Sequence, residues 1–426
     1  MTAASLIPFF SLIAISLLRA GGADPCSGRY IFIQHLPPRF NRDLLADCAA
    51  YPVWQDFCPY KANLGLGPKT HNGTSSWFRT DPYLLEPLFH ARMYQYPCLT
   101  PDPDLASAVF LPYYASLHSL PFLFGPDQNY SIAHGLDLAR LLSDSSVYRR
   151  RHGHDYFFVA SRTALDFSRP LDSRPDAWGT SLLELPAFFN FTVLVTESRA
   201  WPWQEHAVPY PTSFHPSTLS HLHTWLRRVR RSPRPTLMLF AGGATMSPNG
   251  PPNIHRSILS QCASTAESIC SIADCSRSAC DHDPGRYMRP MLRARFCLQP
   301  PSDTPTRRST FDGMIAGCIP VFFEDRSAKS QYDWHMRPEE YRDFSVFIAK
   351  DEVVWGGLNI SRVLMGIGDE EVRRMREKVI EMIPRIIYRG HRSSKSLREE
   401  VKDAFDLAVE GVIRKIKHRI SNLGVD

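Results

Sequence analysis

The segment from 293 to 325 carries residues whose types and order suit a diphosphate site. Its sequence, RARFCLQPPSDTPTRRSTFDGMIAGCIPVFFED, predicts a strand, a loop, a helix and a second strand. A helix that begins just after a strand offers backbone N–H groups and the positive end of its dipole to an anion. The residues that open this helix are Thr306, Arg307, Arg308 and Ser309. Their guanidinium and hydroxyl groups are further hydrogen-bond donors, so the pattern favours a diphosphate site here.

Asp312 follows early in the same helix, where its carboxylate could accept hydrogen bonds from the hydroxyls of a ribose. A purely structural interpretation stays open for this segment. Thr306 or Ser309 would then only cap the helix, and the two arginines would be solvated.

Two residues of the N-terminal half could act as a general base. RYIFIQHLPPRFN (29–41) predicts a strand that ends at His35, and ligands of open α/β sheets bind at the carboxyl ends of strands. Asp155 directly precedes a strand in RHGHDYFFVASRTALDF (151–167), where it could be a base or bind sugar hydroxyls. A hydrogen-bonded structural histidine and a turn-forming aspartate are the alternatives. The HGHD sequence lacks the spacing of helix-borne ligands, so we expect no metal site there.

Short runs of apolar, β-branched and aromatic residues predict the strands that would position these groups. The runs are 30–33, 109–111, 156–159, 192–195, 237–240, 296–298, 319–323 and 346–348. Helical patterns occupy 84–96, 254–262, 369–388 and 396–413, and the last opens with a predicted capping box of Ser396 and Glu399. Alternating strands and helices indicate an α/β protein with parallel sheets.

A loop followed by a basic helix, within 203–236, predicts a hinge between two α/β halves. We therefore expect a signal peptide or short signal-anchor at 1–23, an N-terminal α/β domain at 24–225 and a C-terminal α/β domain at 226–390. A C-terminal helix follows at 391–426.

The composition excludes several classes of protein. Of 426 residues, 43% are hydrophobic and 22% charged, which argues against a disordered chain, a fibre or a multispanning membrane protein. The net charge is only +6 and no long basic run occurs, so nucleic acid is not an expected partner. The apolar run 3–18 is shorter than the roughly 20 residues of a membrane span.

Ten cysteines and four Asn-x-Ser/Thr sequons, at Asn72, Asn129, Asn190 and Asn359, indicate an oxidising compartment of the secretory pathway. The cysteines form no CxxC pair, which favours disulfides over a zinc site.

Long motifs of this chain resemble those of a known family. They are RYIFIQHLPPRFN, LLEPLFHARMYQYPCLTPDPDLASAVFLPYYASL (84–117), YPTSFHP (210–216), RFCLQP, TRRSTFDGMIAGCIPVFF and QYDWHM (331–336). From Cys26 to Tyr388 the chain resembles the plant exostosin-like glycosyltransferases, in the branch of the xyloglucan galactosyltransferases.

The resemblance implies the GT-B fold, in which two Rossmann-like domains face each other across a cleft. It implies an inverting enzyme that uses UDP-galactose as donor, needs no metal and forms a β-linkage to xylosyl side chains of xyloglucan. It also implies a single-pass type II protein of the Golgi membrane with a lumenal catalytic domain, and possible complexes with other Golgi glycosyltransferases. His35 and Asp155 are then the candidates for the base, and Thr306, Arg307, Arg308, Ser309 and Asp312 for the UDP-sugar.

The chain departs from the family pattern near the expected cleft. The usual Gly-Asp-Ser/Thr before TRRS is Ser302-Asp303-Thr304, the usual Asp-His-Phe begins at Asp155 as DYF, and AGGATM (241–246) lacks an arginine. These departures are compatible with another donor such as galacturonic acid or arabinose, with another acceptor such as mannan, or with a non-catalytic glycan-binding partner.

Overall fold

We analysed a computed structural model, which describes residues 24–50, 56–70, 76–123, 128–174, 177–199, 203–243, 252–276, 280 and 282–424. The expected signal peptide or anchor at 1–23 and the sequon at Asn72 lie outside these residues. Within them, no helix has both the length and the apolar character needed to cross a membrane.

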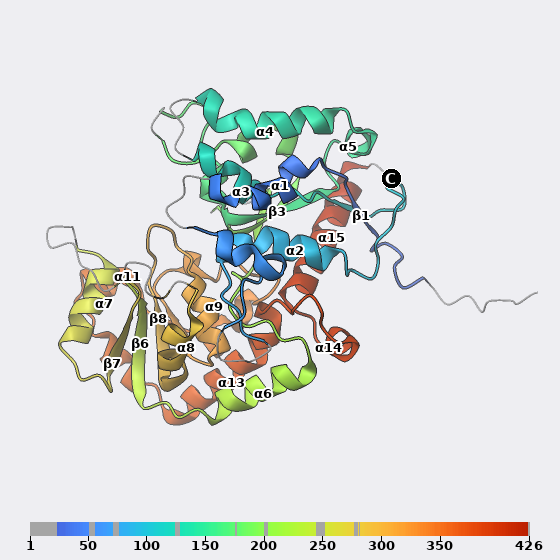
Figure 1. Cartoon of the computed structure of the whole chain (residues 1–426). Coiled ribbons are helices and arrows are strands. Elements are labelled where there is room, and N and C mark those ends of the chain that lie inside the picture. The colour runs from blue at the N-terminus through green and yellow to red at the C-terminus, as the bar shows by residue number, and fades with distance from the viewer. Residues whose placement is uncertain are drawn as a thin grey trace, which may run out of the picture.

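The described chain forms two parallel five-stranded sheets, one in each of two domains (Figure 1). The first has the order β1-β2-β3-β4-β5, from β1 (Ile31–Ile33), β2 (Ala108–Phe110), β3 (Tyr156–Thr163), β4 (Thr192–Glu197) and β5 (Glu205–Ala207). The second has the order β10-β9-β8-β6-β7, from β6 (Thr236–Gly242), β7 (Cys270–Asp274), β8 (Ala294–Gln299), β9 (Ile319–Phe322) and β10 (Val346–Phe347). The expectation of an α/β fold with two Rossmann-like domains is confirmed.

Helices surround both sheets. In the first half of the chain they are α1 (Arg42–Ala46), α2 (Leu85–Met93), α3 (Ala115–Ser119), α4 (Gln128–Ser143) and α5 (Ser146–Arg151). Those that follow β5 are α6 (Leu219–Arg231), α7 (Ile254–Ala263), α8 (Pro284–Arg293), α9 (Arg308–Ile315), α10 (Tyr341–Phe344), α11 (Lys350–Val354), α12 (Ile360–Met365), α13 (Asp369–Ile386), α14 (Lys395–Glu400) and α15 (Ala404–Leu423). Short 3-10 turns connect several of them.

The first sheet is covered on both faces, as its continuous apolar strands predict. Along β3, Phe157 and Val159 point toward α2 and α15, whereas Tyr156 and Phe158 belong to the cluster on the α4 side. The alternation follows from the two-residue period of a strand. Two separate cores therefore lie on the two faces of one sheet.

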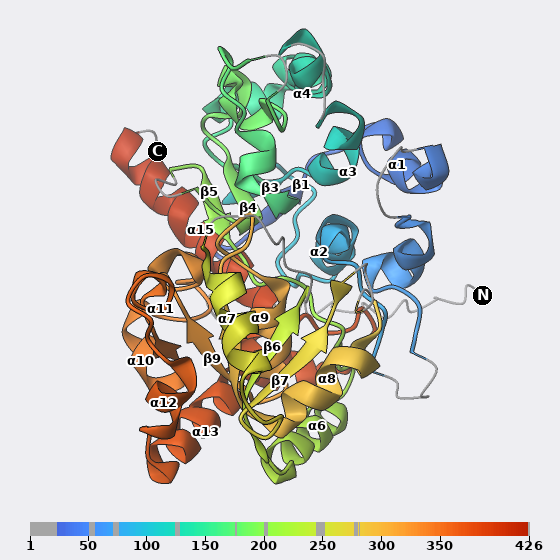
Figure 2. The same ribbon diagram turned by 90° about the vertical axis from the view of Figure 1, so that its left-hand side faces the viewer.

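The C-terminal helix α15 packs on the first domain although it follows the second in sequence (Figure 2). Its residues Phe405, Val409 and Val412 are buried in the same cluster as Leu88 and Phe89 of α2. The chain thus crosses between the domains twice, once within 208–218 and once within 387–403. The expected boundary after residue 225 falls inside α6, and the expected separate C-terminal helix is part of the first domain.

The two crossing segments bind each other. The Tyr388 hydroxyl donates a hydrogen bond to the Pro209 carbonyl at 2.8 Å, and His215 Nδ1 lies 2.7 Å from the Tyr388 carbonyl. Close by, the buried Asp403 carboxylate accepts from Arg92 of α2 at 2.6 Å and from the Arg389 backbone N–H at 2.7 Å. This contact connects α2, the second crossing and the start of α15.

All ten cysteines form disulfides: Cys26–Cys98, Cys48–Cys58, Cys262–Cys270, Cys275–Cys280 and Cys297–Cys318. The preference for disulfides over zinc is confirmed. Among the described residues, no group of three or more His, Cys, Asp or Glu side chains is arranged to hold a metal ion.

Each of the eight predicted strands corresponds to an observed one, but β5 and β7 were not predicted. The helix expected at 396–413 is two helices, α14 and α15, broken between Val401 and Asp403. The predicted capping box of Ser396 and Glu399 is wrong, because Ser394 caps α14 and a capping box of Asp403 and Asp406 begins α15. Helix α15 begins at this point because Asp403, its N-cap residue, is buried in an ion pair with Arg92.

We predict that Asp403→Ala lowers the free energy of unfolding by about 3–5 kcal/mol, because it removes the nearest ionic partner of the buried Arg92 guanidinium and leaves only Asp406, at 3.6 Å. Lys402→Ala, which breaks the exposed ion pair with Glu410, should change it by less than about 0.5 kcal/mol. Chemical denaturation of both variants measures the difference. Equal effects would mean that the Asp403 contact does not hold α15 in place.

The pH dependence of this stabilisation has a defined sign. Burial by itself would raise the pKa of Asp403, but the Arg92 and Arg389 guanidinium groups beside it outweigh burial and lower that pKa well below its ordinary value. A lowered folded-state pKa means that the stabilisation is present above the unfolded pKa of about 3.9 and is lost as the pH falls further. Asp403→Ala should therefore reduce the acid sensitivity of unfolding.

Candidate active site

The carboxyl ends of the two sheets face each other. The Tyr332 hydroxyl, from the loop after β9, donates to the Thr196 carbonyl in β4 at 2.9 Å. Gln331 Oε1 accepts from the backbone N–H and the hydroxyl of Ser198, just after β4, at 2.8 and 2.9 Å. Since ligands of open α/β sheets bind at carboxyl edges, the functional groups of both domains converge on this junction.

In the second sheet, the order of strands reverses between β6 and β8. The loops that follow these two neighbouring strands lead to opposite sides, which opens a crevice where such sheets bind ligands. Gly242 ends β6 at this crevice and Gly243 follows it, and Pro300 follows β8. This is the place that the fold provides for a nucleotide.

Arg307 lies in this crevice. Its guanidinium donates to the Pro300 carbonyl at 3.3 Å and sits 5.7 Å from the centre of the Phe240 ring. A Cβ at Gly242 would lie 3.0 Å from Arg307 Nη2 and 2.5 Å from the Phe240 ring, so glycine makes room for both. Arg307 is half-buried in the crevice between β6 and β8, and this burial lowers the pKa of its guanidinium group from the ordinary value.

Helix α9 begins beside this guanidinium. Arg307 is its N-cap residue and makes no side-chain cap, so the first turn lacks the usual side-chain acceptor. Ser309 in that turn donates to Gln299 Oε1 at 2.7 Å and accepts from Arg307 Nε at 3.4 Å. An uncapped helix start next to an arginine suits a phosphate group. Arg307 and Ser309 thus lie together at this helix start, and their roles in binding the UDP-sugar stay predictions.

Arg308 and Asp312 occupy a different place. The Arg308 guanidinium donates to the Thr80 carbonyl at 2.9 Å and to the Ser213 hydroxyl at 3.0 Å, and it lies 3.3 Å from the Asp312 carboxylate. Burial raises the pKa of Asp312 to about 6, and Arg308 opposes that rise. The contacts of both side chains lie at the junction of the domains and not in the β6/β8 crevice, and their expected diphosphate and ribose roles stay predictions.

Thr306 contacts a residue that the sequence analysis did not select. Its backbone N–H and hydroxyl both donate to Glu197 Oε2, at 2.8 and 2.6 Å, and its hydroxyl lies 3.0 Å from the Tyr210 hydroxyl. Glu197 ends β4 and is only 5% exposed. Burial raises its pKa, while the bonds from Thr306 oppose that rise. A carboxylate of the first domain thus lies against the loop that begins α9.

The first domain also has an arginine at the carboxyl edge of its sheet. Arg162, near the end of β3, binds the Asp166 carboxylate at 2.6 Å, and Trp178 donates to the other oxygen of Asp166 at 2.6 Å. The Arg162 guanidinium lies 4.5 Å from the centre of the half-exposed Tyr83 ring. Its partners, Asp166 and Tyr83, fix the direction of this guanidinium group.

The two predicted bases are far apart in the fold. Asp155 precedes β3 and therefore lies at the amino end of the first sheet, fully buried, with Arg150 at 3.1 Å and Arg151 at 3.4 Å. This position does not suit a base in the cleft. His35 is exposed at the carboxyl end of β1, three strand spacings, or roughly 14 Å, from β4.

The rule that selected His35 also applies to Glu197. Both residues follow a buried apolar run, and carboxyl ends of parallel strands share one edge. Because the order of strands is not visible in the sequence, nothing there indicated which strand end lies opposite the helix of Arg307. The departure at Ser302 is accommodated, since its backbone is not among the described non-glycine residues with positive φ.

Two Rossmann-like domains with facing carboxyl edges have the architecture of the GT-B class. Residues 25–363 match the model of the family described as Exostosin GT47 domain, and the chain belongs to this family.

Three proteins of Arabidopsis thaliana illustrate its similarity to relatives. "Probable xyloglucan galactosyltransferase GT19" is 57% identical over 93% of this chain and 92% of the relative. "Xyloglucan galactosyltransferase MUR3" is 39% identical over 94% of this chain and 64% of the relative. "Xyloglucan-specific galacturonosyltransferase 1" is 34% identical over 92% of this chain and 58% of the relative.

We predict that Arg307→Ala weakens UDP binding by about 1.5–3 kcal/mol, roughly ten- to a hundredfold, because a charged hydrogen bond to phosphate is lost. Arg308→Ala is the matched control: it should lower the melting temperature while a folded fraction keeps near-normal UDP affinity. Calorimetric titration with UDP measures both. Unchanged affinity in Arg307→Ala would refute the crevice as the diphosphate site.

Proposed function

We propose that this protein transfers galactose from UDP-galactose to xylosyl side chains of xyloglucan, with inversion at the anomeric carbon to give a β-linkage. The observation that carries the proposal is that the loop beginning α9 places Arg307 against Phe240 of β6, while the preceding residue, Thr306, binds Glu197 on the facing sheet edge at 2.6 Å. Membership of the exostosin GT47 family and relatives that are named xyloglucan galactosyltransferases support this donor and acceptor.

The chemistry requires two kinds of group. The acceptor hydroxyl loses its proton to a base as its oxygen attacks the anomeric carbon, and the bond from that carbon to UDP breaks in line with the attack. Negative charge then builds up on the leaving diphosphate. Arg307 and the start of α9 would stabilise that charge with donors already in place, without a metal ion.

For the base we favour Glu197 over His35 and Asp155. Its carboxylate ends β4, an interior strand of the first sheet, and lies against the loop of Thr306, whereas His35 follows the edge strand β1. Its raised pKa makes the carboxylate a stronger proton acceptor than an exposed one. Asp155, buried at the opposite edge of that sheet, would reach the cleft only after a rearrangement of the fold.

The protein would act in the Golgi lumen, held to the membrane by its N-terminal segment as a single-pass type II protein. Association with other Golgi glycosyltransferases is part of this proposal. The family resemblance supports the location and the association, and the five disulfides suit the oxidising lumen of the secretory pathway.

A second candidate differs only in the donor. One relative carries the name of a galacturonosyltransferase at 34% identity, so the same fold and reaction could serve UDP-galacturonic acid. UDP-arabinose as donor, mannan as acceptor and a non-catalytic role as a glycan-binding partner are weaker candidates, because none of the relatives described above carries such a name.

A donor screen tests these proposals. Residues 24–426 are incubated with xylosylated glucan oligosaccharides and, separately, UDP-galactose, UDP-galacturonic acid and UDP-arabinose, and the product mass is read. We expect the gain of one hexose from UDP-galactose alone. A gain from another donor would replace the sugar, and no gain together with no UDP-induced rise in melting temperature would favour the non-catalytic partner.

We predict that Glu197→Gln lowers kcat by about a hundredfold or more, because the variant cannot accept the acceptor proton, while UDP affinity is kept. His35→Ala is the comparison and should keep most of the turnover. Steady-state kinetics with UDP titration separates the two. Loss of turnover in His35→Ala but not in Glu197→Gln would return the base to His35.

A further inference from the structure

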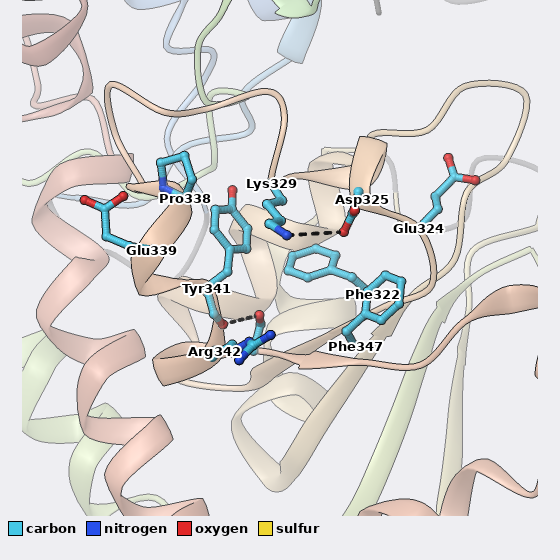
Figure 3. A pocket seen from close by; sticks show the side chains of 10 residues that line it. Phe322, Glu324, Asp325, Lys329, Pro338, Glu339, Tyr341, Arg342 and Phe347 are labelled. Carbon is cyan, nitrogen blue, oxygen red and sulfur yellow. Dashed lines mark hydrogen bonds and ion pairs between the residues drawn. The ribbon is translucent and has the colours of Figure 1, made fainter.

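A cavity of about 560 Å³ opens at the carboxyl ends of β9 and β10 (Figure 3). It lies at the edge of the second sheet, on the other side of β8 from the crevice of Arg307. Its volume is within the range of roughly 300–1,000 Å³ that is typical of ligand sites. The proposed reaction assigns no role to it.

Two phenyl rings form one wall. Phe322 of β9 and Phe347 of β10 are direct partners in the parallel register, so their side chains lie next to each other on the same face. Phe322 is 3% exposed, whereas Phe347 is 56% exposed. In this wall the Phe322 ring is therefore packed in the protein, and the Phe347 ring is open to solvent.

A buried hydroxyl faces this space. Tyr341 is 5% exposed, and within the described residues its hydroxyl has no hydrogen-bond partner. Figure 3 shows the hydroxyl end of its ring directed between Pro338 and Lys329, into the cavity. Buried polar groups are normally satisfied, so an unsatisfied hydroxyl that lines a cavity points to a ligand with hydrogen-bonding groups of its own.

The cavity is lined by charges of both signs, with Glu324, Asp325 and Glu339 against Lys329 and Arg342. Asp325 lies 3.9 Å from Lys329, and Glu324 lies 2.8 Å from Lys350. Paired charges of both signs do not attract a diphosphate or a polyanion. They do offer donors and acceptors to a neutral ligand that is rich in hydroxyl groups, and an aromatic ring suits the apolar face of a sugar.

We propose that this cavity is a subsite for a neutral stretch of glycan: the part of the acceptor that extends beyond the sugar receiving the transfer. The inference rests on the proposed function. No residue of α9 lines the cavity, so the donor diphosphate at Arg307 is bound by other groups. The cavity volume suits a ligand of more than one ring, which a chain acceptor provides.

The test compares binding of xyloglucan oligosaccharides of one and two repeats to the full lumenal chain by calorimetry. Phe347→Ala should weaken binding of the longer oligosaccharide about five- to tenfold, through loss of the aromatic contact, and affect the shorter one less. Tyr341→Phe should weaken it in the same sense by removing one hydroxyl. Tyr94→Ala, which removes a similarly exposed ring of the first domain, is the control and should bind like wild type.

Steady-state kinetics distinguish an effect on the acceptor from an effect on the donor. We expect a raised KM for the longer acceptor with kcat and the KM for UDP-galactose unchanged. Unchanged acceptor binding in both variants would overturn the proposal, as would a raised KM for UDP-galactose alone, which would place the donor hexose in the cavity.

The binding arm does not depend on turnover. If the chain transfers no galactose, length-dependent binding that Phe347→Ala abolishes still supports the subsite, while the proposed function fails. If the chain transfers galactose and neither variant changes binding, the subsite fails and the function stands. Melting temperatures near wild type show that the exposed substitution leaves the fold intact.

Discussion

The bond between Glu197 and Thr306 is the contact on which the active-site geometry depends. A buried carboxylate at the end of one sheet accepts two hydrogen bonds from the loop that begins α9 in the other domain. Because every strand in both sheets is parallel, all the carboxyl ends of each domain lie at one edge. Bringing those two edges together collects groups from distant parts of the sequence at one junction.

The return of α15 keeps the edges facing each other. A helix that follows the second domain fills the core of the first, and the buried Arg92–Asp403 pair fixes the point at which it enters. The hydrogen bond from the Tyr388 hydroxyl to the Pro209 carbonyl joins the two crossing segments, so two connections rather than one link the domains. The relative positions of the domains are thereby limited to motions that keep these contacts.

Arg307 and Arg308 show how helix geometry divides the work of adjacent residues. Arg307 occupies the N-cap position of α9 with an extended backbone and enters the β6/β8 crevice, whereas Arg308 is already helical and turns toward Thr80 and Asp312. Successive helical residues point about 100° apart, so identical neighbours rarely share a target. Gly242 completes the crevice by leaving space where a side chain would meet Arg307.

The sequence by itself determined the class of fold, eight of the strands, the disulfide chemistry and the helix start at Arg307, because these depend on local periodicity and residue type. It missed β5 and β7, a three-residue strand and an edge strand with alternate residues exposed, since neither has an apolar run.

Only the tertiary structure decided which carboxyl lies in the cleft. Asp155 and Glu197 both adjoin predicted strands, but strand direction places one at the far edge and the other opposite α9. Such a distinction depends on the order of strands and the facing of two domains, which are long-range properties that no local pattern encodes.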